Sequence, residues 1–207
     1  MYAKYIKRIL DFILSLIALI VLSPVLLVVA ILVRIKLGSP IIFKQQRPGK
    51  DERIFTLYKF RTMTDKKDEN GNLLPDSERL TKFGKVLRST SLDELPELVN
   101  ILKGDMSIVG PRPLLIRDML FMTDEQRKRH TVRQGLTGLA QINGRNNINW
   151  EEKLEYDLQY IKNITFVEDM KIIFKTVLKV LKRDDINTDG MDTAEDLCDY
   201  LLRTNKI

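Results

Sequence analysis

The segment FILSLIALIVLSPVLLVVAILV (residues 12–33) decides the fold expected for this chain. Its 22 residues carry no formal charge. At about 1.5 Å per residue, a straight helix of that length would cross the roughly 30 Å hydrocarbon core of a bilayer. The run is too long for a cleaved signal peptide, and basic residues rather than small ones follow it. The sequence therefore predicts a membrane-associated helix at the amino terminus.

Two features of this segment favour a bent helix over a straight span. The dipeptide Ser23-Pro24 lies near its middle, where proline removes a backbone donor and clashes with the carbonyl group four residues earlier. The Ser23 hydroxyl can bond an upstream carbonyl oxygen and so satisfy the interrupted helix. Both ends are flanked by basic residues, which favour the cytoplasmic side: Lys4, Lys7 and Arg8 before the segment, and Arg34, Lys36, Lys44 and Arg47 after it. We therefore expect a re-entrant membrane helix over residues 1–36, with an ordinary proline-containing transmembrane helix as the alternative.

The charge distribution indicates the kind of partner. The chain has 34 basic and 28 acidic residues, a net charge of +6. Residues 184–207 carry seven acids and two basic residues, a net charge of −5, which leaves +11 for residues 1–183. With the apolar amino terminus, so basic a body favours an anionic membrane surface or a phosphorylated substrate over nucleic acid. The single cysteine, Cys198, excludes an internal disulfide and fits a reducing compartment.

The rest of the sequence predicts one small domain. Aromatic and β-branched residues favour short extended segments at 41–47 and 53–63. Apolar residues at helical spacing predict amphipathic helices, and a glycine-rich segment at 131–145 predicts a loop or short strands. The helices are expected over 78–89, 93–103, 118–130, 149–163 and 168–183. We therefore expect an α/β fold, with a main domain over residues 37–183 and an acidic tail over residues 184–207.

The last of these helices is basic on one face, which carries Lys171, Lys175, Lys179 and Lys182. Such a helix suits the headgroup boundary of an anionic membrane. It equally suits a core-packing helix with a solvated lysine face, and the sequence leaves both interpretations open.

The segment STSLDELPELVNILKGDMSIVGPRP (residues 89–113) contains the candidate site. Asp93 and Glu94 are adjacent at an expected helix start. Ser91 and Glu94 fit a capping box, although Pro96 is better tolerated if Asp93 is itself the cap. On these residues alone, helix capping is favoured over a catalytic role.

The surrounding cations favour a catalytic role for the two acids. Arg112 lies between Pro111 and Pro113, and two prolines stiffen the backbone on both sides of a guanidinium that suits bidentate gripping of a phosphate. Further cations lie near short turns: Lys59, Arg61, Arg88 and Arg145. Carboxylates among several cations are what a magnesium-assisted phosphoryl transfer requires.

Five motifs in order carry a family resemblance: KRILDF (7–12), Ser23-Pro24, YKFRTM (58–63), residues 89–113, and GLTGLAQINGR (135–145). Together they resemble the bacterial sugar transferases, the small monotopic phosphoglycosyl transferases, over about residues 1–183. The resemblance implies transfer of a sugar-1-phosphate from a UDP-sugar to undecaprenyl phosphate, with Mg²⁺ and release of UMP. It places residues 37–183, as the catalytic domain, on the cytoplasmic face of the bacterial inner membrane.

The resemblance also implies residue roles. Asp93 matches the nucleophile that forms a covalent phosphosugar intermediate, and Glu94 matches its partner, which places the metal or accepts a proton. The Pro111-Arg112-Pro113 segment matches a phosphate-binding position, and Ser23-Pro24 matches the re-entrant break. Substrate-binding cations would be Lys59, Arg61, Arg88 and Arg145. The donor sugar is not readable from any residue, and resemblance alone favours N,N′-diacetylbacillosamine, as in N-linked glycan assembly, over an N-acetylhexosamine.

Two other functions fit parts of this pattern: a non-catalytic scaffold on anionic membranes, and a Mg²⁺-dependent hydrolase of lipid-linked phosphates. The segment DINTDGMDTAED (185–196) approaches a calcium loop but ends in Asp196 where a glutamate is usual, so a solvated acidic turn before a short terminal helix is favoured. We expect His130 at a surface or interface, and Trp150 in a packing or interfacial role. The sequence does not indicate an oligomeric state.

Overall fold

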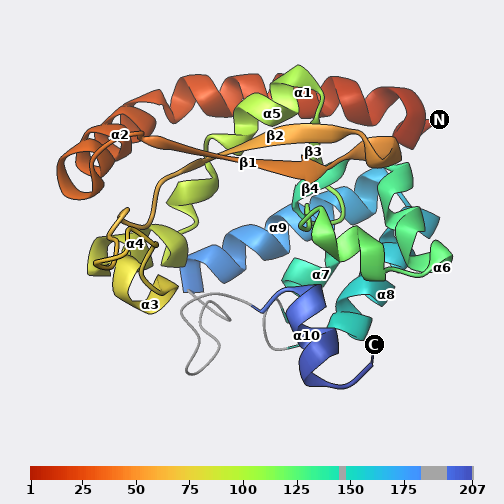
Figure 1. The fold of residues 1–207 in the computed structure, drawn as a ribbon. Helices are drawn as coiled ribbons and strands as arrows, with labels where there is room; N and C mark the ends of the chain where they lie inside the picture. Colours follow the sequence, from red (N-terminus) through yellow and green to blue (C-terminus); the bar gives the residue numbers. More distant parts are fainter. Residues whose placement is uncertain (145–147, 183–194, 207) are drawn as a thin grey trace.

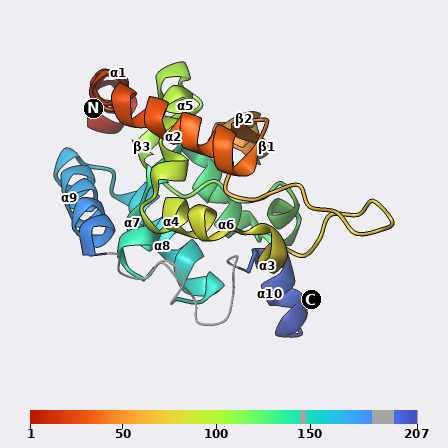
Figure 2. The same ribbon diagram turned by 90° about the vertical axis from the view of Figure 1, so that its left-hand side faces the viewer.

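A computed structural model describes residues 1–144, 148–182 and 195–206 of the chain. They form a small domain of helices and short strands, as the expected α/β class requires. The amino-terminal helices lie along one side of the molecule beside the first two strands, and the carboxyl-terminal helix lies at the opposite side (Figure 1, Figure 2).

The apolar segment folds as two helices that meet at a sharp bend. A π-helical turn η1 (Tyr2–Ile6) leads into α1 (Lys7–Val21), and α2 (Ser23–Leu37) follows after Leu22. The two halves are bent by 64°, and the Ser23 hydroxyl donates to the carbonyl oxygen of Ile20 at 2.8 Å. The predicted bend and the serine contact are both confirmed. Within the described ranges, no one helix combines the length and hydropathy of a membrane span, whereas the bent pair taken together does.

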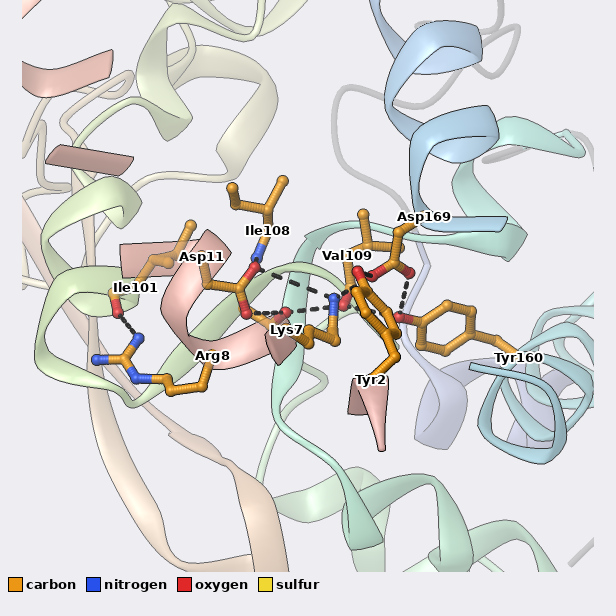
Figure 3. Close-up of polar contacts among 10 residues, drawn as sticks. Tyr2, Lys7, Arg8, Asp11, Ile101, Ile108, Val109, Tyr160 and Asp169 are labelled. Carbon is orange, nitrogen blue, oxygen red and sulfur yellow. Dashed lines mark hydrogen bonds and ion pairs between the residues drawn. The ribbon is translucent and has the colours of Figure 1, made fainter. Parts of the chain in front are cut away.

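Three charged residues at the start of α1 fix it to the body. Asp11, 4% exposed, accepts hydrogen bonds from the Ser107 hydroxyl at 2.7 Å and the Ile108 amide at 3.1 Å (Figure 3). Lys7 lies 2.6 Å from a carboxylate oxygen of Asp169. Each buried charge therefore has a partner, as burial demands.

Arg8 and Tyr2 add further contacts to this anchoring. Arg8 donates to the carbonyl oxygens of Ile101 (2.6 Å) and Leu102 (2.8 Å) near the end of α5 (Glu97–Lys103), a favourable place for a cation. The Tyr2 hydroxyl donates to Asp169 at 2.6 Å, and the Tyr160 hydroxyl bonds the other oxygen of that carboxylate at 2.7 Å (Figure 3). The amino-terminal half-helix is thus tied to α5, to β3 (Met106–Val109) and to α9 (Phe166–Lys182).

An antiparallel hairpin carries one of the predicted cations. Strands β1 (Ile42–Pro48) and β2 (Ile54–Phe60) pair in the register Gln45 opposite Leu57, joined by the 3₁₀ turn η2 (Lys50–Glu52). Both extended segments are confirmed. The hairpin packs on α5 through Leu57, and the buried Asn100 side chain donates to Thr56 O (2.7 Å) and accepts from Tyr58 N (3.1 Å). These bonds fix the position of Lys59 relative to α5.

A second, parallel pair joins two motifs that are distant in sequence. Strands β3 and β4 (Gln134–Thr137) pair with Met106 opposite Gln134. A Cβ at Gly135 would lie 2.1 Å from the amide nitrogen of Gly110, so only glycine permits this approach. The Gly135 amide donates to Pro111 O at 2.8 Å. The contact holds the GPRP segment (residues 110–113) against the GLTG segment (residues 135–138).

The remaining helices agree in part with the expectations. The helix expected over 78–89 divides into α3 (Asp76–Arg79) and α4 (Lys82–Ser89). The one expected over 118–130 is three short elements, η4 (Arg117–Phe121), α6 (Asp124–Arg127) and η5 (Lys128–Thr131), because Thr123 and Gln126 form a capping box that starts a new helix. The last two predicted helices are confirmed as α8 (Trp150–Lys162) and α9, and two short helices, α7 (Leu139–Ile142) and α10 (Leu197–Arg203), are also present.

Two side-chain expectations have different outcomes. His130 is 1% exposed, so its expected place at a surface or interface is wrong; η5 turns it inward beside the buried Arg129. Trp150 packs in an apolar cluster with Leu154 and Leu197, as its packing role requires. The calcium-like segment 185–196 lies largely outside the described residues.

Candidate active site

The two adjacent acids lie in a 3₁₀ turn ahead of a helix. Asp93 and Glu94 belong to η3 (Leu92–Glu94), and α5 begins only at Glu97, after Pro96. Ser91 has a left-handed backbone with φ of 54° and makes no side-chain capping bond. Neither capping arrangement is formed, so the capping interpretation is wrong. A left-handed serine two residues before Asp93 is a strained conformation of the kind that clusters at functional sites.

A third carboxylate completes the acidic cluster. Asp93 is 8% exposed and Glu97 is 3% exposed, and both lie close to the partly buried Glu94. Sequence reasoning missed Glu97. Its spacing of three residues from Glu94 is the signal that would have found it, because residues three apart share a helix face.

Two of the predicted cations, Lys59 and Arg112, form ion pairs with this acidic cluster. Lys59, on β2, places its ammonium 2.8 Å from Glu94 Oε1 and 3.2 Å from Glu97 Oε1. Arg112 places Nη2 at 2.6 Å from the same Glu94 oxygen. One carboxylate oxygen thus lies between two cations that are 35 and 18 residues away along the chain.

The surroundings shift the pKa values of these three carboxyl groups in different directions. Burial, with the neighbouring charge of Glu94, raises the pKa of Asp93 to about 6, although Lys59, Arg88 and Arg112 oppose the rise. Burial would also raise the pKa of Glu94, but Arg112 and Lys59 outweigh it and hold that pKa below its usual range. Burial raises the pKa of Glu97 to about 7, against the charge of Lys59. Groups with perturbed pKa values in one cluster are typical of a reactive site.

The segment Pro111-Arg112-Pro113 is here called the arginine strap. A second arginine, Arg129, holds its backbone in place. The Arg112 side chain is 45% exposed while both prolines are buried. The Arg129 guanidinium donates to the Arg112 carbonyl oxygen at 2.6 Å. Arg129 also pairs with Asp157 of α8 through bonds of 2.8 and 2.9 Å, and both side chains are buried. The strap backbone is therefore fixed, while the guanidinium of Arg112 remains accessible.

Arg47 is a further cation that sequence reasoning did not place here. Its Nη1 lies 3.5 Å from the carbonyl oxygen of Pro113, and Nη2 donates to Gln45 at 2.6 Å. Burial, reinforced by the positive charge of Arg112, lowers the pKa of Arg47 to about 10. The cation stays charged at neutral pH and adds to the positive field around the strap.

The other predicted cations lie in different places, and not all of them are near the acidic cluster. Arg88 donates to the Thr62 hydroxyl at 3.1 Å, and its charge acts on Asp93. Arg61 instead pairs with Asp65 at 2.8 Å and approaches the Leu37 carbonyl oxygen at 3.4 Å, beside the loop that follows β2. Arg145 lies outside the described residues.

The carboxylate pair is compatible with a magnesium ion held partly by substrate. Among the residues with described positions, no cluster of three or more His, Cys, Asp or Glu side chains is arranged to hold a metal. Magnesium is usually bound through one or two carboxylates plus substrate phosphates and water. Asp93 and Glu94 are two carboxylates, which is the number that such a site uses.

The fold and site define a class of protein: one with a buried carboxylate cluster faced by several cations, suited to a phosphorylated substrate. Comparison of the sequence with protein families gives the identification. The model of the bacterial sugar transferase family matches residues 2–183, and the chain belongs to that family.

Individual relatives agree with this assignment. A sugar transferase of uncharacterised specificity, EpsL of Bacillus subtilis, is 51% identical over 92% of this chain and 94% of its own length. The UDP-glucose:undecaprenyl-phosphate glucose-1-phosphate transferase of Klebsiella pneumoniae is 44% identical over 84% of this chain but only 39% of its own length. The UDP-N-acetylgalactosamine-undecaprenyl-phosphate N-acetylgalactosaminephosphotransferase of Aeromonas hydrophila is 37% identical over 86% of this chain and 44% of its own. The chain thus spans nearly all of one relative and less than half of the other two.

Proposed function

We propose that this protein is a phosphoglycosyl transferase that moves a sugar-1-phosphate from a UDP-sugar to undecaprenyl phosphate and releases UMP. The observation that carries the proposal is Glu94, held between Lys59 and Arg112 beside the buried Asp93. Family membership supports it, as do relatives named for transfer to undecaprenyl phosphate.

In the first half-reaction, a carboxylate oxygen of Asp93 attacks the phosphorus that bears the sugar. A bond forms between that oxygen and phosphorus, and the bond to the bridging oxygen breaks, so that UMP leaves with the electron pair. A carboxylate needs no general base for this step. Arg112 and Lys59 offset the charge on the transferring phosphoryl group, and the stiff strap keeps Arg112 in place.

In the second half-reaction, a phosphate oxygen of undecaprenyl phosphate attacks the acyl phosphate. The new phosphorus–oxygen bond gives the lipid diphosphate sugar, and the Asp93 carboxylate is released. Division into two steps lets the nucleotide leave before the lipid acceptor enters. Asp93 and Glu94 would hold Mg²⁺, which would supply positive charge at the donor diphosphate.

We assign residues 1–36 to a re-entrant membrane helix, residues 37–183 to the catalytic domain and residues 184–207 to an acidic tail. The bend at Ser23-Pro24 supports the re-entrant arrangement, as does the exposure of large apolar side chains such as Ile20 and Leu27 on both halves. Basic residues at both ends favour the cytoplasmic face of the bacterial inner membrane. On α9, exposed Phe174 and Val177 among lysines suit contact with anionic lipids.

The identity of the donor sugar distinguishes two versions of this reaction. Within the family, the motifs resemble those of PglC of the Campylobacter N-glycosylation pathway, which would make the donor UDP-N,N′-diacetylbacillosamine. The relatives described above are instead named for glucose and N-acetylgalactosamine donors. A panel of UDP-sugars distinguishes these possibilities through the rate of UMP release.

The function is tested with protein in detergent or nanodiscs, undecaprenyl phosphate, Mg²⁺ and that panel. The wild type is expected to release UMP with at least one donor, and Asp93→Asn is expected to release none. Inorganic phosphate released from the lipid without a UDP-sugar would indicate a hydrolase instead. Salt-sensitive vesicle binding that is indifferent to Asp93, with no turnover, would indicate a membrane scaffold.

A further inference from the structure

The carboxyl-terminal helix α10 lies outside residues 2–183, yet it packs against the chain that leaves the arginine strap. Leu197, 3% exposed, enters an apolar cluster with Leu114, Met122, Trp150 and Leu154. Leu114 directly follows Pro113, the last residue of the strap. Docking of α10 therefore buries the first side chain after the strap.

Polar contacts hold the following residues to the same helix. Arg117 pairs with Asp196 and, at 3.2 Å, with Asp199. Asp118 is 1% exposed and accepts from the Leu115 amide at 2.9 Å. Burial raises the pKa of Asp118, and the amides of Leu115 and Cys198 oppose that rise. Residues 114–118 are thus fixed by apolar and polar contacts to the start of α10.

The acids at the start of α10 also act on cations beside the strap. Burial lowers the pKa of Lys153, the charge of Arg112 adds to this effect, and Glu195 opposes it. Burial and Arg112 lower the pKa of Arg47, whose Nη1 lies 3.5 Å from the Pro113 carbonyl oxygen, and the charges of Asp118, Glu97 and Asp196 oppose that fall. Glu195 and Asp196, which directly precede α10, therefore offset part of the positive charge near the strap.

We propose that α10 is a positioning element of the donor site: its docking fixes residues 114–118 and so holds the Arg112 guanidinium where it grips the donor diphosphate. The inference rests on the proposed function. Linkage then requires a reciprocal effect, because if docking favours donor binding, bound donor must favour docking to the same extent.

The chain contains two native probes of docking. Trp150, the only tryptophan, lies in the cluster that Leu197 enters, so undocking exposes it and moves its emission to longer wavelength. Cys198, the only cysteine, is a partly buried residue of α10, so its rate of reaction with a thiol reagent reports undocking.

The variant that breaks docking is Leu197→Ala. Its matched control is Leu202→Ala, which removes the same side chain from the exposed face of the same helix, where Leu202 is 58% exposed. Leu197→Met is the conservative variant, since a volume-conserving exchange is tolerated. Circular dichroism and the melting temperature establish that each variant remains folded.

Leu197→Ala is expected to raise the Cys198 labelling rate and to lower kcat/KM for the UDP-sugar by at least about tenfold, the scale of a buried leucine truncation. kcat/KM for undecaprenyl phosphate is expected to stay unchanged, as are all values for Leu202→Ala, while Leu197→Met remains near wild type. A loss confined to the donor distinguishes positioning from general destabilisation, which lowers both values together.

A second test uses bound donor and leaves α10 unchanged. In the Asp93→Asn protein, which cannot consume the donor, Cys198 labelling is expected to slow several-fold when the UDP-sugar is added with Mg²⁺. Labelling indifferent to the donor overturns the inference, as does a Leu197→Ala protein that labels fast but keeps the wild-type kcat/KM for the donor. A wild type that releases no UMP with any UDP-sugar overturns the proposed function, and this inference with it.

Discussion

Arg129 holds Arg112 by its backbone: the buried guanidinium donates to the Arg112 carbonyl oxygen at 2.6 Å while it pairs with Asp157. The pair leaves the side chain of Arg112 free to contact Glu94 at the front of the strap. A buried ion pair contributes little net stability, but the loss of one partner is costly because the other charge remains in an apolar site.

Asp157→Asn is therefore expected to destabilise the protein by about 3–5 kcal/mol and to lower kcat/KM for the donor. Denaturant unfolding and UMP release measure the two effects. Glu155→Gln is the matched control, because it neutralises an exposed acid on the same helix and should change neither. An Asp157→Asn protein as stable as the wild type would show that the pair does not hold the strap.

The raised pKa of Asp93 predicts an acidic limb in the pH profile. The nucleophile must be ionised, so kcat/KM for the donor is expected to fall as the pH drops below about 6. Arg88 lowers this pKa through its positive charge, so Arg88→Gln should move the limb to higher pH. A limb that moves to lower pH, or does not move, contradicts the electrostatic assignment.

His130 predicts sensitivity of folding to acid. Burial, with repulsion from Arg129, lowers the pKa of His130 to about 4, so the folded state favours the neutral ring. The corresponding stability is complete above the unfolded pKa of about 6.5 and is lost as the pH falls toward about 4. Denaturant unfolding between pH 7 and 5 should show a shallower loss for His130→Gln. Equal slopes for both proteins would exclude His130 as the source.

The re-entrant arrangement predicts that both ends of the bent helix pair face the same side of the membrane. In a Cys198→Ser background, Lys4→Cys and Lys36→Cys should react equally with an impermeant thiol reagent added to one side of sealed vesicles. Labelling of the two positions from opposite sides would establish a true span.

Local signals were sufficient for some parts of this structure. Pro24 predicted the bend because proline acts on its own helix, and the hydrophobic periodicity predicted α8 and α9. The four-residue strand β3 was missed because its parallel pairing with β4, 28 residues later, is not a local property. His130 was misplaced because its flanking basic residues indicate a surface, whereas Arg129 is neutralised by Asp157 from another helix.

The candidate site was likewise predicted in part by local signals and in part not. Asp93, Glu94 and Arg112 were found through residue type and stiffness, but their approach depends on how η3, β2 and the strap pack together. Nothing local indicated that Lys59 contacts Glu94 and Glu97 while Arg61, two residues on, turns to Asp65. The buried Arg129–Asp157 pair and the docking of α10 likewise required the folded structure.

The most direct test of the central claim is the mass of the intact protein after incubation with a productive UDP-sugar and Mg²⁺, without the lipid acceptor. A covalent intermediate on Asp93 predicts a gain equal to one sugar phosphate, located on Asp93 by peptide mapping, absent from Asp93→Asn and removed when undecaprenyl phosphate is added. Full turnover by Asp93→Asn, or an adduct on another residue, would contradict the assignment of Asp93 as the nucleophile.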